Sequence, residues 1–255
     1  MKKILLFCLL LFAQRVSAQN INIDSLIRLA MVKIENDPLT IQPNRDSLFN
    51  VLTHTSIARE KIALIYKIIN SGQGSSREGL IYHYRILTWA KKNNDRLSEA
   101  IISAELGFET AVNGDIAEGE SMAQRALIAA KKTKNNEAIG IAYDNLGCCY
   151  STDEADKISV QIAANYFKEG VKFSLAGNND LFVAYNLGGA GSCFNILGKT
   201  DSALYYTLKS LEYAVRKNVA IQIANGLLDL GNEQKSDALK LKYFRAGLKI
   251  ASKKS

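Results

Sequence analysis

The chain has 255 residues, a length that suits one or two globular domains, and a formal charge of +7. Three of its bases, Lys2, Lys3 and Arg15, lie in the first eighteen residues, and without them 29 bases face 25 acids, a net charge of +4. This excess is too small to favour a nucleic-acid-binding protein, and we expect no nucleic acid partner.

The first eighteen residues have the layout of a secretory signal peptide. Two lysines precede an apolar run from Ile4 to Ala13, and the segment ends in Val16-Ser17-Ala18. The run is too short to span a bilayer stably, and no later stretch approaches the roughly 20 apolar residues of a transmembrane helix. We expect cleavage after Ala18 and an exported protein, periplasmic in a Gram-negative cell or secreted, without stable membrane insertion.

Residues 19–55 form a second predicted part, with N-terminal helices and a proline-containing connector. Apolar residues recur every three to four positions from Asn22 to Glu35, which predicts a helix, and Asp46 to His54 is predicted as another. The only prolines of the chain, Pro38 and Pro43, fall between them. Proline breaks helices, so the connector ends the first helix and everything after it is free to be helical.

Residues 56–255 form the third predicted part, a series of helices of similar length. The first of them, Ser56 to Asn70, is expected to turn Ile57, Ile62, Ile65, Ile68 and Ile69 inward. The others are predicted at Arg77–Lys91, Arg96–Val112, Asp115–Lys131, Glu137–Tyr150, Ser159–Ala176, Leu181–Leu197, Ser202–Lys217, Ala220–Leu230 and Asp237–Ser252. Because short Gly, Asn and Asp turns join them, consecutive helices should pack antiparallel.

An internal period of about 40 residues runs through this part. Aromatic pairs recur at Tyr82/Tyr84, Tyr166/Phe167, Tyr205/Tyr206 and Tyr243/Phe244, and Asn-rich turns keep the same spacing at 93–95, 135–137 and 178–180. Such a period is typical of stacked units that cannot bury their apolar faces alone. The stretch 151–158 is four residues longer than in the sister repeats, and this insertion is either a site of partner contact or a neutral surface loop.

The small and aromatic residues of these units resemble tetratricopeptide repeats (TPR). The three sets are Leu106-Gly107, Gly114, Gly119 and Ala126; Leu146-Gly147, Tyr150, Ala163, Phe167 and Gly170; and Ala190-Gly191, Phe194, Gly198, Ala203 and Ser210. The resemblance covers roughly residues 56–255 and is similar to the exported TPR sensor regions of bacterial membrane-bound regulators. It implies an all-α fold, a right-handed superhelical solenoid of about five to six antiparallel helix pairs. The period is longer than the family's 34 residues, and the family's helix-crossing proline is missing.

The resemblance also implies a concave groove on one face of each first helix. The groove candidates are Phe108, Asp144, Cys148, Tyr185, Ser192 and Asn195. Phe108 and Tyr185 flanking Asp144 suit an extended or helical segment with apolar anchors. The alternative, that these residues only pack between repeats, stays open.

Motifs for catalysis, cofactors or metals are not evident in the sequence. The stretch Leu197-Gly198-Lys199-Thr200 lacks the first glycine of a phosphate-binding loop, since Cys193 stands there. His83 is expected to be a packed, hydrogen-bonded imidazole, and Cys148, Cys149 and Cys193 to be buried or groove-lining thiols without metal or disulfide spacing. We therefore expect no enzyme, no cofactor and no metal site.

These observations predict a non-catalytic exported repeat scaffold that binds a protein or peptide in its groove. One alternative is a ligand-sensing module that acts with a separate membrane-bound regulator. Another is a self-associating structural protein, because Leu241, Phe244 and Leu248 of the final helix could stay exposed.

Overall fold

The protein is described by a computed structural model, which covers residues 22–35, 44–70, 77–152 and 155–252. Within these ranges the chain forms helices joined by turns and no strand, so the all-α prediction is confirmed. The predicted signal peptide at 1–18, the two prolines and the predicted loop at 71–76 lie outside the described residues.

The helices belong to two compact units, each described here by itself. The central unit is residues 38–182 and the terminal unit combines residues 1–37 with 183–255. The central unit holds α3 (Arg45–His54), α4 (Ala58–Asn70), α5 (Arg77–Lys92), α6 (Arg96–Val112), α7 (Ile116–Thr133), α8 (Asn136–Tyr150) and α9 (Lys157–Ala176). The terminal unit holds α2 (Ile23–Glu35), α11 (Thr200–Lys217), α12 (Ala220–Asn232), α13 (Asp237–Ala251) and, from Val183 on, α10 (Asp180–Ile196). The predicted bounds are correct to within three residues at both ends of every helix.

The Asn-rich turns end one helix and begin the next. At the turn before α6, Asn94 takes a left-handed backbone conformation with φ 54°, which asparagine tolerates better than most residues. The next residue, Asp95, caps α6 by accepting a hydrogen bond from the backbone N–H of Ser98 at 3.1 Å. Lys134 and Asn135 repeat this arrangement before α8. The turn chemistry therefore explains why the period is visible in the sequence.

Glycines allow the paired helices of the central unit to approach closely. Helix α6 packs against α7 and α8, and α8 packs against α9. A Cβ atom placed on Gly119 of α7 would lie 2.6 Å from the carbonyl oxygen of Gly107 and from the backbone nitrogen of Ala111, both in α6. On Gly140 of α8 it would lie 2.9 Å from the backbone nitrogen of Ser174. A side chain at either glycine would push the helices apart.

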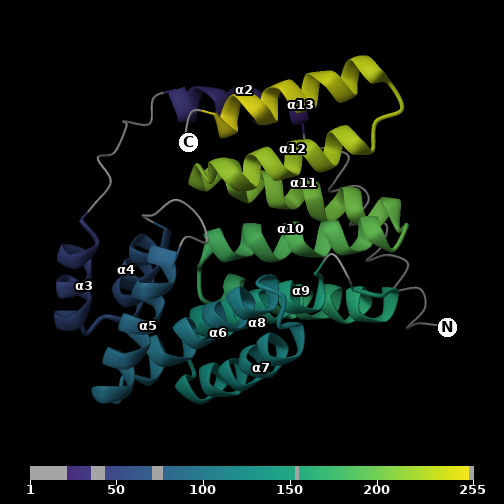
Figure 1. The fold of residues 1–255 in the computed structure, drawn as a ribbon. Coiled ribbons are helices and arrows are strands. Elements are labelled where there is room, and N and C mark those ends of the chain that lie inside the picture. Colours follow the sequence, from purple (N-terminus) through teal and green to yellow (C-terminus); the bar gives the residue numbers. More distant parts are fainter. Residues whose placement is uncertain (1–21, 36–43, 71–76, 153–154, 253–255) are drawn as a thin grey trace, which may run out of the picture. The chain divides into compact units, whose positions relative to one another are not determined.

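In the terminal unit, the first described helix packs against two of the last ones. Helix α2 contacts α11 and α13 and contributes the fully buried Ala30 to their core (Figure 1). The Lys33 ammonium donates hydrogen bonds of 2.9 Å to the carbonyls of Val215 and Arg216, near the C-terminus of α11. A cation is favourable there because the last helical carbonyls lack partners. The spacing of apolar residues did not indicate this long-range contact.

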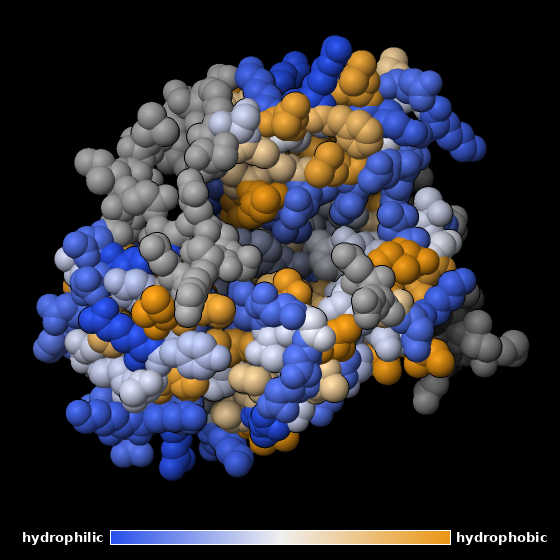
Figure 2. Space-filling model, viewed as in Figure 1, coloured by the Kyte–Doolittle hydropathy of each residue, from blue (hydrophilic) through white to orange (hydrophobic). Residues whose placement is uncertain are grey.

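Two expectations about exposed and buried side chains are corrected. Ile57 was expected inward but is 56% exposed, because it precedes the first residue of α4 and is outside the helical periodicity. On α13, Leu241 and Leu248 are exposed as expected, whereas Phe244 is half-buried against Gly231 of α12. Figure 2 shows hydrophobic side chains among hydrophilic ones over α12 and α13. None of the helices in the described ranges is both long and apolar enough to cross a membrane.

We predict that Gly119→Ala lowers the free energy of unfolding by about 1–3 kcal/mol, because the added methyl group meets backbone atoms of α6 that cannot move independently. The measurement is urea unfolding followed by circular dichroism. The matched control is Gly226→Ala in α12, where the nearest atom to an added Cβ is 3.7 Å away. There we expect no loss and a gain of up to about 1 kcal/mol from helix propensity. Equal losses in both variants would contradict the close approach at Gly119.

Candidate binding site

A cavity of about 450 Å³ lies in the central unit, where α6 and α8 end. It is lined by Phe108, Ala111 and Val112 of α6, Gly114 and Ile116 at the start of α7, and Cys148, Ser151 and Thr152 at the end of α8. Two of the predicted groove residues, Phe108 and Cys148, thus lie in one cavity. Its last two lining residues begin the predicted insertion, of which residues 153 and 154 lie outside the described ranges.

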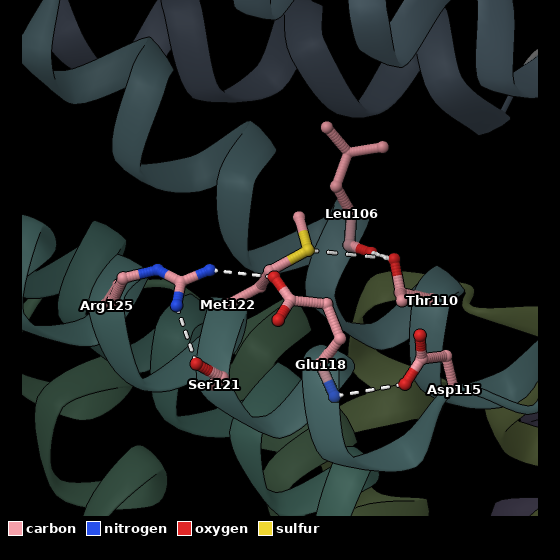
Figure 3. A network of polar contacts seen from close by, with 7 residues as sticks. All are labelled: Leu106, Thr110, Asp115, Glu118, Ser121, Met122 and Arg125. Carbon is pink, nitrogen blue, oxygen red and sulfur yellow. Dashed lines mark hydrogen bonds and ion pairs between the residues drawn. The ribbon is translucent and has the colours of Figure 1, made fainter.

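The turn between α6 and α7 forms one wall of the cavity. Gly114 has φ 103°, a conformation that side chains other than glycine rarely adopt, and this allows the chain to reverse there. The carboxylate of Asp115 then caps α7 by accepting from the Glu118 N–H at 3.2 Å. Figure 3 shows that this polar network continues along α7, where Arg125 contacts the Glu118 carboxylate at 2.9 Å and the Ser121 hydroxyl at 2.6 Å.

The same network also links the two helices beside this wall. The Thr110 hydroxyl lies 2.7 Å from the Leu106 carbonyl within α6 and 3.8 Å from the sulfur of Met122 in α7 (Figure 3). The carbonyl contact is a hydrogen bond, and the sulfur is a weak acceptor that adds little. The wall is therefore held by local caps and by the packing of α6 on α7.

An acidic cluster lies on α6 and α8 next to the cavity. The Glu105 carboxylate accepts hydrogen bonds on the same oxygen, Oε1, from the Tyr66 hydroxyl of α4 and from the Asn145 side-chain amide of α8, the latter at 2.8 Å. Burial raises the pKa of Glu105, although these two hydrogen bonds and the nearby His83 favour its ionised form. The second acid of the cluster, Asp144, precedes Asn145 on α8.

Within the cluster, Asp144 has fewer hydrogen bonds than Glu105 to offset the cost of its burial. Its Oδ1 is buried and has no hydrogen-bond partner in the described part of the chain. Burial raises the pKa of Asp144 well above its ordinary value, and the neighbouring charge of Glu105 raises it further. Neither Asp144 nor Glu105 forms an ion pair with a lysine or arginine among the described residues. Two acids of adjacent helices thus share a poorly solvated position without an ion pair to a lysine or arginine of the described residues.

Helical geometry connects the acids to the cavity. Asp144 and Cys148 are four residues apart on α8, and Glu105 and Phe108 are three apart on α6, so each pair shares one helix face. The rise of a helix separates Asp144 from Cys148 by about 6 Å along the axis. All four residues are half-buried, whereas the neighbouring Leu106 and Leu146 are fully buried in the core. The two acids therefore share helix faces with Phe108 and Cys148 of the cavity, although neither acid is one of its lining residues.

The other predicted groove residues, Tyr185, Ser192 and Asn195, belong to the terminal unit. Ser192 of α10 is hydrogen-bonded to Asp229 of α12. Burial raises the pKa of Asp229 to about 6, although the Ser192 hydrogen bond acts in the opposite direction. Tyr185 is half-buried and Asn195 is exposed. A partly buried acid with a raised pKa is thus found in both units.

The remaining residues considered in the sequence are one histidine and three cysteines. His83 is 6% exposed and its Nδ1 lies 2.9 Å from the Gly79 carbonyl, so the prediction of a packed imidazole is confirmed. Cys148, Cys149 and Cys193 form no disulfide, and burial raises the pKa of the latter two thiols to about 12. The described residues contain no group of side chains suited to hold a metal ion.

Two residues of the acidic cluster, Glu105 and Asn145, were not predicted from the sequence, and neither was Asp229 of the terminal unit. A signal for the first two was present, because Tyr66, Glu105 and Asn145 are 39 and 40 residues apart and so keep the period of the aromatic pairs. These three residues lie on α4, α6 and α8, where two hydrogen bonds join them. No comparable spacing in the sequence indicates Asp229.

Comparison with known proteins gives no relative from which a role could be transferred: no family model matches the sequence, and no curated protein is similar to it. The site has to be interpreted from its own geometry.

We predict that Cys148 reacts with iodoacetamide at pH 7.5 at least about ten times faster than Cys149 and Cys193. It is half-exposed in the cavity, whereas the other two thiols are buried and have almost no thiolate at this pH. The measurement is a time course of modification by tandem mass spectrometry, which separates the adjacent Cys148 and Cys149. Equal rates at the three cysteines would contradict the burial described here.

We also predict that Asp144→Asn stabilises the protein at pH 7 and does so less as the pH falls towards 4. Folding raises the pKa of Asp144 above its ordinary value of 3.8, so the carboxyl costs no stability below that pH and an increasing amount as the pH rises through its folded value. Thermal unfolding across this pH range measures the difference. The matched comparison is Glu60→Gln, which removes a carboxyl at an exposed position of α4, and a gain in stability at pH 7 for Asp144→Asn that does not shrink towards pH 4 would contradict the prediction.

Proposed function

We propose that this chain is a non-catalytic, exported repeat scaffold that binds a segment of another protein or a peptide. In this proposal the helices pair as TPR-like repeats in a right-handed solenoid, and the first helix of each pair contributes to a binding groove. The observation that carries the proposal is the cavity between the ends of α6 and α8. It is lined by Phe108 and Cys148, which the repeat register had placed in the groove.

The repeat interpretation is supported by contacts that recur at the sequence period. The Tyr66–Glu105–Asn145 hydrogen bonds join equivalent positions of α4, α6 and α8, and the Asp and Asn caps recur at the starts of α6 and α8. Neighbouring first helices are in contact, since α6 packs against both α4 and α8. Repeats stacked in this way present one continuous face of equivalent residues.

The cavity suits an apolar side chain of a bound segment. Its lining combines Phe108, Ile116 and Val112 with the small residues Ala111 and Gly114, and hydroxyl groups are confined to the Ser151 and Thr152 side. A lining of this kind receives an aromatic or aliphatic anchor, and a groove beside it accommodates the rest of the segment. The site thus offers shape and apolar surface, which are the requirements of binding.

A second candidate is a ligand-sensing module that works with a separate membrane-bound regulator. The volume of about 450 Å³ favours it, because it falls within the range of about 300–1,000 Å³ typical of small-molecule sites. The two candidates differ in whether the occupant of the cavity is part of a macromolecule.

The test is photocrosslinking in the native host from a benzophenone attached to Cys148 in the cavity. We expect one dominant protein adduct, identified by mass spectrometry. The matched control carries the probe on the outer surface of the same unit, as Lys132→Cys in a Cys148→Ser background, and should not give that adduct. Absence of any cavity-specific protein adduct would overturn the scaffold proposal in favour of a small-ligand sensor, and adducts between copies of this chain would indicate self-association.

A further inference from the structure

The acidic cluster beside the cavity is costly for the protein alone. Taking carboxylates out of water is unfavourable, and two of them close together repel each other, so the folded state without a ligand holds Asp144 and Glu105 at a disadvantage. Other acids of the chain, such as Asp95 and Asp46, have an ion pair with a lysine or arginine. Asp95 pairs with Lys61 in the same central unit, so a structural acid there does obtain a cation.

The hydrogen bonds of the cluster leave a defined set of acceptors for a ligand. Both protein donors, Tyr66 and Asn145, contact Oε1 of Glu105, so its Oε2 has no hydrogen bond in the described part of the chain. Asp144 offers a buried Oδ1 without a partner. The two acids therefore keep acceptor atoms for the N–H donors of a ligand, and no lysine or arginine forms an ion pair with either acid in the described part of the chain.

A guanidinium or ammonium group fits these requirements. Arginine presents five N–H donors in a planar fork. It is also more weakly hydrated than lysine, so it loses less hydration free energy when it enters a poorly solvated position. Hydrogen bonds between charged partners are the strong ones, and a cation between two carboxylates would relieve both their burial and their mutual repulsion. A neutral or acidic ligand would leave this cost in place.

We infer that the segment bound by this protein carries a basic side chain, preferably arginine, a few residues from an apolar anchor: the anchor enters the Phe108–Cys148 cavity and the cation lies between Glu105 and Asp144. This inference rests on the proposed function, because it specifies the ligand of the same groove. The separation of about 6 Å between Asp144 and Cys148 along α8 sets the distance between the two groups. It corresponds to two residues of an extended segment or one turn of a helical segment.

The test is selection of a phage-displayed library of random 12-residue peptides on the purified protein. Peptides that also bind protein with Cys148 alkylated are discarded, so that those remaining depend on the cavity. We expect them to be enriched in arginine or lysine two to four residues from an aromatic or large aliphatic residue. One such peptide is then synthesised with arginine and with citrulline, which has a similar shape and no charge, and both affinities are measured by calorimetry.

We expect citrulline to weaken binding to the unaltered protein at least tenfold, and to weaken it much less in Asp144→Asn and Glu105→Gln. Asp229→Asn, which removes a buried acid of the terminal unit, is the control and should retain the full arginine preference. Cavity-dependent peptides without basic enrichment, or with citrulline as good as arginine, would overturn the inference and leave the proposed function standing. If no selected peptide depends on Cys148, the peptide-binding function itself fails, and the inference with it.

Discussion

The close approach of helix backbones at glycines is the constraint on which the rest of the central unit depends. Where Gly119 meets Gly107, and where Gly140 meets Ser174, a glycine contributes no side chain, and the helices approach closely. This spacing fixes how far α7 and α9 lie from α6 and α8, and therefore which residues of α6 and α8 are left on the partly accessible face. The cavity and the acidic cluster lie on that face.

The candidate site combines two properties that a stable core would avoid. One is a cavity lined largely by apolar side chains, which have fewer packing partners there than in the core. The other is a pair of acids on the adjoining helix faces without an ion pair to a lysine or arginine of the described residues. Stability alone does not require either, and a bound segment with an apolar anchor and a cation would compensate both. A natural protein tends to deviate from good packing and satisfied polar groups where it binds something.

Local chemistry made most of the fold predictable. Helix bounds follow from apolar periodicity and from turn residues such as Asn94 and Asp95, whose conformational and capping preferences act over a few residues. The site was only half predictable. Phe108, Asp144 and Cys148 were groove candidates because the resemblance to a repeat family assigns their positions to a groove, whereas Glu105 was missed because its partner Tyr66 lies 39 residues away on another helix. The burial of an acid and the resulting rise of its pKa cannot be predicted from residue type, because the same acid on an isolated helix would be solvated.

The sequence by itself thus determined that the chain is helical, where its helices begin and end, and that they repeat every 40 residues or so, because these depend on contacts within one or two turns. Only the tertiary structure decided which side chains lie in the cavity, that Asp144 is left without a partner, and that α2 packs on α11 and α13 through Ala30 and Lys33. The physical reason is that burial and long-range hydrogen bonds depend on how helices distant in sequence pack together. Local conformational preferences do not determine that packing.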